Sequence, residues 1–198
     1  MFLGHETEIP KPGDFCTRTI GEDPFIFVRD AQGEIQVLLN VCRHRGTQVC
    51  RVQTGNAKSF ICPFHGWEYD TSGYLLAVPA RKQGYAKLEF REWGMFKAPH
   101  VAVYKGLVFA NLDPAAQSFE EYLGDYKWYL DIHLDLTDGG MEVLGEPHRW
   151  IADANWKQGA EGFCGDSSHT QMTHRSALET GIVDATTGGA PRTDTGLH

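Results

Sequence analysis

The sequence of 198 residues lacks several features that would assign it to a familiar class. No apolar run approaches the ~18 residues that a membrane helix requires, and the N-terminus has neither the basic nor the apolar segment of a secretory signal. There is no Walker-type loop and no GxGxxG, so no nicotinamide or flavin site is recognisable. The net charge of −8 argues against a general nucleic-acid binder, which normally carries a basic patch. These absences predict a protein that binds neither membrane nor nucleic acid.

The number of cysteines is odd. No disulfide framework is evident, which favours a reducing compartment, and we expect a cytoplasmic protein. The five cysteines are Cys16, Cys42, Cys50, Cys62 and Cys164.

Two short pairs of cysteine and histidine carry the clearest chemical signal. Cys42-Arg-His44 is followed, after seventeen intervening residues, by Cys62-Pro-Phe-His65. In a Rieske centre, a [2Fe-2S] cluster has two cysteines on one iron and two histidines on the other. Neutral imidazoles in place of two thiolates raise the reduction potential to about −150 to +300 mV, against about −400 mV for a plant-type cluster. The pattern therefore predicts a [2Fe-2S] site that transfers single electrons.

A structural zinc site is the main alternative for these four residues. Zinc also accepts two cysteines and two histidines, but its short pairs usually join Cys to Cys and His to His. Here each short pair mixes the two residue types, which suits a cluster whose loops each supply one ligand to each iron. The remaining alternative is that the four residues are unrelated.

The residues beside the two pairs favour loops that approach a ligand closely. Gly46 and Gly66 follow the pairs, and glycine permits positive φ or a close approach of the backbone. Pro63 stiffens the second loop because its φ is fixed. Trp67 and Tyr69 alternate along a strand that leaves this loop. We expect Trp67 to pack in the core, and the Tyr69 hydroxyl could lie near the cluster.

The chain reads as two regions of different character. Residues 1–112 contain many short β-rich stretches separated by turn signals, which predicts an antiparallel β domain. After residue 113 helical signals appear, among them Ser118, whose side chain could cap a helix. We expect hairpins from strands 25–28 with 34–39 and 100–104 with 107–112, helices over 119–123 and 126–134, a strand within 141–152, and an interrupted helix over 155–176.

Asp166, His169 and His174 form a second chemical signal. Two histidines and one carboxylate bind iron in non-haem Fe(II) oxygenases and leave open positions for O2 and substrate. His169 and His174 are five residues apart, so on a regular helix they point about 140° away from each other. They can converge on one metal only if the helix ends, bends or contains a bulge between them. The cluster motif upstream gives this otherwise weak pattern its weight, because an electron source needs an acceptor.

Together these motifs resemble the large (α) subunit of the Rieske non-haem iron aromatic-ring-hydroxylating dioxygenases. The resemblance extends from about residue 3 to about residue 180, and the stretch 153–177 is most similar to the branch that acts on naphthalene and larger polycyclic aromatics. It implies a mainly β, antiparallel, sandwich-like Rieske domain over residues 1–112, and a truncated start of an α+β catalytic domain over 113–198. The motifs that carry it are residues 42–46, 62–67, 106–109 and 155–157, with Glu161, Asp166, His169 and His174.

The resemblance also implies which residues serve each metal centre. The two Cys-His pairs would bind the [2Fe-2S] cluster, and His169 and His174 would bind a mononuclear Fe(II). Asp166 would connect His169 to the partner subunit's His65 or His44, which explains why the family assembles as homotrimers or as α3β3 complexes with a small β subunit. Electrons would come ultimately from NADH or NADPH through a ferredoxin or reductase. The reaction would add O2 to an aromatic ring and give a cis-dihydrodiol.

The sequence departs from the family pattern at two places that concern the catalytic iron. The family's third iron ligand is an Asp that would lie beyond His198, and Gly162 stands where the family usually has Asn. We therefore expect a partial sequence. Two other functions stay open: a stand-alone Rieske electron carrier, which would not use His169 and His174, and a monooxygenase or demethylase with the same two centres.

Overall fold

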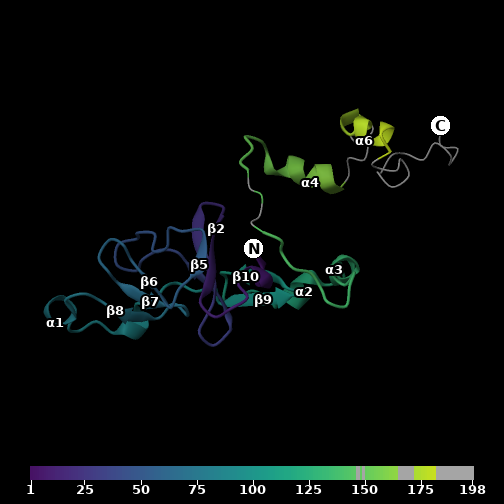
Figure 1. Cartoon of the computed structure of the whole chain (residues 1–198). Coiled ribbons are helices and arrows are strands. Elements are labelled where there is room, and N and C mark those ends of the chain that lie inside the picture. Colours follow the sequence, from purple (N-terminus) through teal and green to yellow (C-terminus); the bar gives the residue numbers. More distant parts are fainter. Residues whose placement is uncertain (146–147, 149, 165–171, 182–198) are drawn as a thin grey trace. The chain divides into compact units, whose positions relative to one another are not determined.

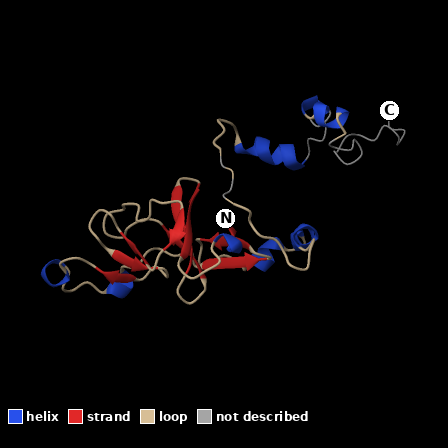
Figure 2. Ribbon diagram, viewed as in Figure 1, coloured by secondary structure: helices blue, strands red, loops and turns tan. Residues whose placement is uncertain are grey.

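The computed structural model describes residues 1–145, 148, 150–164 and 172–181 of the chain (Figure 1). The chain divides into two units, Met1–Glu146 and Pro147–His198. Within the described residues, every strand belongs to the first unit, as Figure 2 shows. None of the described helices is long and apolar enough to cross a bilayer.

The central layer of the first unit is a four-stranded antiparallel sheet in the order β4-β3-β2-β5. In its strand β3, Phe25 and Phe27 pack into one core, whereas Ile26 and Val28 pack into another. Successive side chains on a strand point to opposite faces, so this apolar run separates two cores. Each fully buried side chain of this size contributes about 1.5–3 kcal/mol. The strands are β2 (Asp14–Ile20), β3 (Asp23–Arg29), β4 (Ile35–Leu39) and β5 (Thr54–Asn56).

Asp30 closes the predicted hairpin between β3 and β4. Its carboxylate accepts the backbone N–H groups of Gln32 and Glu34 at 3.0 and 2.9 Å. The same carboxylate accepts a bond from the Gln36 side chain at 2.8 Å and from the Ser72 hydroxyl at 3.1 Å. The prediction of this hairpin is confirmed, and Asp30 also ties it to a turn 42 residues further along the chain.

A second antiparallel sheet, in the order β1-β10-β9, covers one face of the central layer. Its hairpin turns at Lys105 and Gly106, whose φ values of 50° and 86° fit the two-residue turn that matches strand twist. The N-terminal amine donates a 2.8 Å hydrogen bond to the carbonyl of Ala110, so the first residue is part of this layer. The strands are β1 (Phe2–His5), β9 (His100–Tyr104) and β10 (Leu107–Asn111), and the 3-10 helix η1 (Glu6–Glu8) follows β1.

A third, smaller sheet in the order β6-β7-β8 packs with the other face of the central layer. Trp67 and Tyr69 are buried in the core between them, at 1% and 0% exposure, so the predicted core position of Trp67 is confirmed. The elements are β6 (Ser59–Ile61), β7 (Glu68–Asp70), β8 (Leu75–Ala77), the one-turn helix α1 (Arg81–Gly84) and the 3-10 helix η2 (Phe90–Glu92).

The first unit also contains the two predicted helices, α2 (Phe119–Leu123) and α3 (Tyr126–Leu134). The Ser118 hydroxyl accepts the N–H of Glu121 at 3.2 Å, and the Glu121 carboxylate accepts the N–H of Ser118 at 3.0 Å. This reciprocal capping box satisfies two of the N–H groups that a helix start leaves open. Leu123 and Leu134 then pack on Tyr104, which joins the helices to the β1-β10-β9 sheet.

The described part of the second unit is helical. Helix α4 (Trp156–Cys164) confirms the first part of the helix expected over 155–176, and α6 (Arg175–Glu179) begins at the end of that range. The strand predicted within 141–152 is wrong for the residues described there, which form no strand. Leu144 and Ile151 are 86% and 101% exposed. A strand is stable only beside a neighbour that accepts its hydrogen bonds, and the local sequence does not supply that neighbour.

Candidate metal centre

Two loops of matching geometry carry the paired cysteines and histidines. The first loop joins β4 to β5, and the second joins β6 to β7. In each loop the glycine four residues after the cysteine donates its N–H to the cysteine carbonyl, at 2.9 Å for both Gly46 and Gly66. These glycines have φ values of 73° and 69°, as their expected role requires. The N–H groups of Cys42 and Cys62 each donate to the carbonyl five residues ahead at 2.8 Å. The chain therefore builds the same turn twice.

The two loops bring like side chains together. The ring centroids of His44 and His65 lie 4.6 Å apart. Cys42 and Cys62 are 3% and 2% exposed, and burial, with a further contribution from Cys62, raises the pKa of the Cys42 thiol. A bound metal ion reverses that effect, because a coordinating thiol is deprotonated. A two-iron cluster that binds both cysteines on one iron and both histidines on the other needs the cysteines side by side and the histidines side by side.

Tyr69, on β7, lies at the sulfur side of this site. Its hydroxyl oxygen is 3.3 Å from Cys42 Sγ and accepts the backbone N–H of Arg43 at 3.2 Å. Burial and the contact with Cys42 raise the pKa of Tyr69, so the hydroxyl keeps its hydrogen. Because the Arg43 N–H already occupies the oxygen as acceptor, the hydroxyl hydrogen is available to the sulfur. The structure thus places Tyr69 where the sequence suggested.

His44 shows whether the residues present fit an iron ligand set. Its Nδ1 is buried and has no hydrogen-bond partner among the described residues, although buried nitrogens are nearly always satisfied. Its Nε2 lies 3.3 Å from the Tyr85 hydroxyl. Burial, then the charges of His65 and Arg45, lower the pKa of His44, which favours the neutral imidazole that binds metals. His44 therefore has one ring nitrogen available for a metal and the other already bonded. Together with the adjacent cysteine pair and histidine pair, this makes the site fit a [2Fe-2S] cluster.

Residues outside the motifs hold the first loop in place. Asn40 is fully buried, and its side-chain oxygen accepts the N–H groups of Val49 and Cys50 at 3.1 and 2.8 Å. Its amide nitrogen donates to the Cys50 carbonyl at 2.7 Å. The Arg43 guanidinium donates to the Gly94 carbonyl at 3.0 Å. Neither anchor was predicted from the sequence. An asparagine that ends an apolar strand next to the cysteine motif was the signal that could have revealed Asn40.

Of the residues predicted for the second metal, only His174 is among those that the structure describes. Asp166 and His169 lie outside the described residues. His174 is described, lies directly before α6 and is exposed. The structure therefore brings Cys42 beside Cys62 and His44 beside His65. Their role as cluster ligands and the mononuclear iron site both stay predictions.

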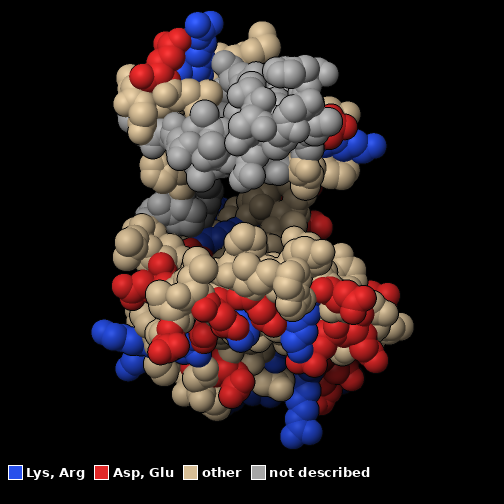
Figure 3. Space-filling model, turned by 90° about the vertical axis from the view of Figure 1, so that its right-hand side faces the viewer, with Lys and Arg blue, Asp and Glu red and all other residues tan. Residues whose placement is uncertain are grey.

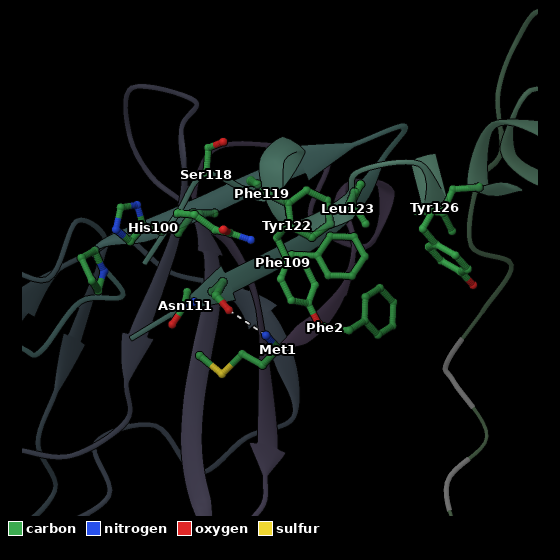
Figure 4. Close-up of a pocket in the computed structure, with 16 residues that line it drawn as sticks. Met1, Phe2, His100, Phe109, Asn111, Ser118, Phe119, Tyr122, Leu123 and Tyr126 are labelled. Carbon is green, nitrogen blue, oxygen red and sulfur yellow. Dashed lines mark hydrogen bonds between the residues drawn. The ribbon is translucent and has the colours of Figure 1, made fainter. Parts of the chain in front are cut away.

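A separate concave region of about 840 Å³ lies between the β1-β10-β9 sheet and helices α2 and α3 (Figure 4). Its wall is aromatic. The rings of Phe109 and Phe119 stack with their centroids 4.3 Å apart, and the ring centroids of Phe2 and Phe109 are 5.5 Å apart. None of the side chains that line it is a cysteine or a carboxylate, and His100 is its one titratable imidazole. This region therefore offers apolar packing surface, whereas the redox chemistry resides in the two loops.

Comparison with known proteins agrees with the geometry of the loops. The biphenyl 2,3-dioxygenase α subunit of Rhodococcus jostii is 48% identical over 185 residues, which cover 93% of this chain and 40% of that protein. The benzene 1,2-dioxygenase α subunit of Pseudomonas putida is 46% identical, with 93% of this chain and 41% of the relative covered. The crystal structure of naphthalene 1,2-dioxygenase from Rhodococcus sp., bound to indole, matches with a TM-score of 0.87 and 54% identity, over 91% of this chain and 41% of that one. This chain thus spans about 40% of the length of these relatives.

The family described as the Rieske [2Fe-2S] domain matches residues 1–105. That stretch contains both matching loops, the buried cysteine pair and the adjacent histidine pair. The zinc alternative and the alternative of unrelated residues are therefore set aside, and this chain belongs to the Rieske [2Fe-2S] domain family.

Proposed function

We propose that this chain is part of the α subunit of an aromatic-ring-hydroxylating dioxygenase, and that it receives electrons for an oxygenase reaction. The observation that carries the proposal is the pairing within the two loops, cysteine with cysteine and histidine with histidine, in a chain similar to dioxygenase α subunits over 93% of its length. In this proposal, residues 1–112 serve electron transfer and residues 113–198 begin the catalytic domain.

The roles of the residues follow from their chemistry. Cys42, Cys62, His44 and His65 would hold the [2Fe-2S] cluster, which supplies one-electron transfer when bound. His169 and His174 would bind a mononuclear Fe(II), the centre at which the family combines O2 with an aromatic ring.

Asp166 would connect the two centres across a subunit boundary. In the proposal its carboxylate accepts hydrogen bonds from His169 and from a cluster histidine of the neighbouring subunit. The structure favours the partner subunit's His65 over its His44 for this role. The outward nitrogen of His44 is already bonded to Tyr85 in its own chain, whereas no hydrogen bond from the described residues reaches the ring of His65. This arrangement needs more than one copy of the chain, consistent with a homotrimer or an α3β3 complex.

The charge distribution supports an acidic electron donor of the ferredoxin type. Residues 41–98, which contain both cluster loops, carry nine Lys and Arg against four Asp and Glu, although the whole chain has a net charge of −8. Residues 99–146 carry two Lys and Arg against nine Asp and Glu. Figure 3 shows acidic side chains gathered over the side of the first unit where α2 and α3 lie. An acidic partner reduced by NADH or NADPH would thus be steered toward the cluster-bearing part of the chain.

An ionic-strength series tests this steering. The rate at which a reduced, acidic ferredoxin delivers electrons to the chain should fall steeply as salt rises from about 10 to 500 mM, because screening shortens the Debye length from about 30 Å to a few Å. Replacing Arg81 and Lys82 of α1 by Glu should slow delivery at low salt, and Arg175→Glu in the second unit should not. A rate that is independent of salt would rule out the acidic donor.

The experiment that tests the cluster is an EPR spectrum of the anaerobically reconstituted, dithionite-reduced chain. A rhombic signal with the lowered average g-value of histidine-ligated clusters is expected. Cys62→Ala should abolish it, whereas the matched Cys164→Ala variant, at an exposed cysteine of the second unit, should keep it. A silent spectrum with stoichiometric zinc would overturn the electron-transfer function.

A chimera tests the oxygenase function. Residues 3–180 should replace the matching part of the R. jostii biphenyl 2,3-dioxygenase α subunit, and products should be measured with biphenyl and naphthalene. A cis-dihydrodiol is expected, and its loss is expected with His169→Ala or Asp166→Asn. A chimera that keeps the cluster signal but yields no oxygenated product would favour the stand-alone electron carrier.

A demethylase is the second candidate. The N,N-dimethyl phenylurea N-demethylase α subunit of a Sphingobium species is 45% identical over 92% of this chain. The same chimera assayed with an N-methylated arylurea separates the candidates, because a demethylase releases formaldehyde and a dioxygenase forms a dihydrodiol.

A further inference from the structure

The two predicted histidine ligands differ in what surrounds them. The His44 ring stacks on Trp67 at 5.0 Å with the ring planes 6° apart, and its Nε2 meets the Tyr85 hydroxyl at 3.3 Å. The ring centroids of His65 and Phe64 are 3.9 Å apart, and Phe64 is 57% exposed. His44 is therefore held by its own chain on one face and at one nitrogen, whereas the described residues hold His65 by ring contacts alone.

The free and bonded nitrogens of His44 define the direction of its hydrogen bond. The buried Nδ1 has no partner among the described residues, so it is the nitrogen that faces the cluster site. A neutral imidazole that gives one nitrogen to a metal carries its hydrogen on the other. Nε2–H of His44 therefore donates, and the Tyr85 hydroxyl oxygen accepts.

The backbone around α1 sets the position of Tyr85. Ala80 adopts the left-handed conformation with φ of 53°, which turns the chain into the single turn of α1. The Tyr85 N–H closes that turn by donating to the Arg81 carbonyl at 2.9 Å. The Tyr85 ring then meets Trp67 edge-on at 5.6 Å and 87°. A non-glycine residue in the left-handed region is uncommon and marks a conformation that the surroundings impose, so the hydroxyl is placed by the fold.

We propose that Tyr85 is a positioning residue, which fixes the orientation of His44 and lowers the reduction potential of the cluster. A hydrogen-bond acceptor on the outer N–H of a ligating imidazole increases the basicity of the ligand. A more basic ligand stabilises the oxidised, more positive state. The inference depends on the [2Fe-2S] cluster alone and not on the oxygenase activity proposed above.

Tyr69 provides the opposite case within the same site. Its hydroxyl donates toward Cys42 Sγ at 3.3 Å, and hydrogen bonds to the sulfurs stabilise the reduced state of such clusters. One tyrosine thus accepts from the histidine side and lowers the potential, whereas the other donates to the cysteine side and raises it. The two tyrosines should therefore shift the reduction potential in opposite directions, so a measurement of the potential alone tests the inference.

The test compares three Tyr→Phe variants of the reconstituted full chain by redox titration monitored by EPR. At the wild-type midpoint, Tyr85→Phe should raise the ratio of reduced to oxidised cluster about threefold, which is about 30 mV at 59 mV per tenfold change. Tyr69→Phe should shift the ratio the other way. Tyr74→Phe, at a tyrosine that is 57% exposed in the same region, should leave it unchanged. Tyr85→Phe with no shift beyond Tyr74→Phe, or with the sign of Tyr69→Phe, would overturn the proposal.

If the Tyr85→Phe variant does not take up the cluster, a measurement on the wild-type chain tests the proposal instead. With 15N-labelled histidine, pulsed EPR in D2O follows the exchange of the outer N–H protons of the two ligands. One slowly exchanging proton, that of His44, and one rapidly exchanging proton, that of His65, are expected. Equal and rapid exchange of both protons would show that Tyr85 does not hold His44.

Discussion

The two units of this chain differ in how far each covers its own apolar side chains. The first unit closes two cores around a central sheet and contains the four residues predicted to hold the cluster. In the second unit, large apolar side chains stay exposed, among them Trp150, Ile151, Trp156 and Met172 at 79–101%. Both predicted cluster cysteines, Cys42 and Cys62, are themselves part of one of the two cores of the first unit. The predicted residues of the second metal lie instead in a segment whose described part has no core of its own.

A matched pair of isoleucine truncations measures this difference and should give the largest effect. Ile26→Ala, at a fully buried position of β3, should lower the free energy of unfolding by about 2–5 kcal/mol, because it removes buried carbon and leaves a cavity. Ile151→Ala, at a fully exposed position, should change it by less than about 0.5 kcal/mol. Urea unfolding of the reconstituted chain measures both. Equal effects would mean that Ile151 is covered and that the two units are not as different as the exposures indicate.

A carboxylate in each unit extends the comparison to pH. Burial tends to raise the pKa of Asp30, but the hydrogen bonds from Gln36, Glu34, Ser72 and Gln32 outweigh burial and hold that pKa below its usual value. A lowered pKa stabilises the fold above the unfolded value of about 3.9, and this stabilisation is lost as the pH falls through the lower folded value. Asp30→Asn should therefore cost about 1–3 kcal/mol at pH 7 and progressively less below about pH 4.

Glu179 serves as the control for that pH series. It pairs with Arg175 at 2.7 Å on the surface of α6, and both side chains are more than half exposed. Exposed pairs of this kind contribute little, so Glu179→Gln should be almost neutral across the same pH range. Thermal unfolding from pH 3 to pH 7 measures both variants. A cost of Asp30→Asn that stays constant down to pH 3 would contradict the lowered pKa.

What the sequence predicted well depends on short stretches of chain. The ligand pairs and the glycines at positive φ are encoded within a few residues, since glycine permits the turn and the residue types determine the metal chemistry. The same holds for the hairpin at Lys105-Gly106 and for the helix cap at Ser118. In each case the interacting groups are near neighbours in the sequence, so a local pattern was sufficient.

What the sequence did not predict depends on partners far along the chain. Tyr85 reaches His44 across 41 residues, and Arg43 reaches Gly94 across 51. No local pattern signals such contacts, because they arise only after three sheets have packed together. The strand expected within 141–152 is wrong for the same reason: a strand needs a neighbouring strand to pair with, and the local sequence does not specify one.

A pair of glycine-to-alanine substitutions should give the smallest effect on stability. The substitution in one unit should stabilise, and the substitution in the other should destabilise. Gly162 lies in α4, and an added Cβ there meets nothing within 4 Å. Gly162→Ala should therefore stabilise α4 by about 0.5–1 kcal/mol, through lower conformational entropy of the unfolded chain, and should slow amide exchange in α4 about two- to fivefold. Gly73→Ala in the first unit should destabilise instead, because its φ is +85° and its Cβ would lie 2.9 Å from Leu38.

Hydrogen exchange followed by mass spectrometry reads both substitutions in the same chain. Slower exchange in α4 with Gly162→Ala would show that the space around this helix is open, so that a side chain such as the asparagine usual in the resembling family could be accommodated there. Faster exchange would show that Gly162 is needed for a close approach of other parts of the chain to α4. In that case the absence of a side chain at residue 162 is a packing requirement, and the contrast between a packed first unit and an uncovered second unit would no longer hold at α4.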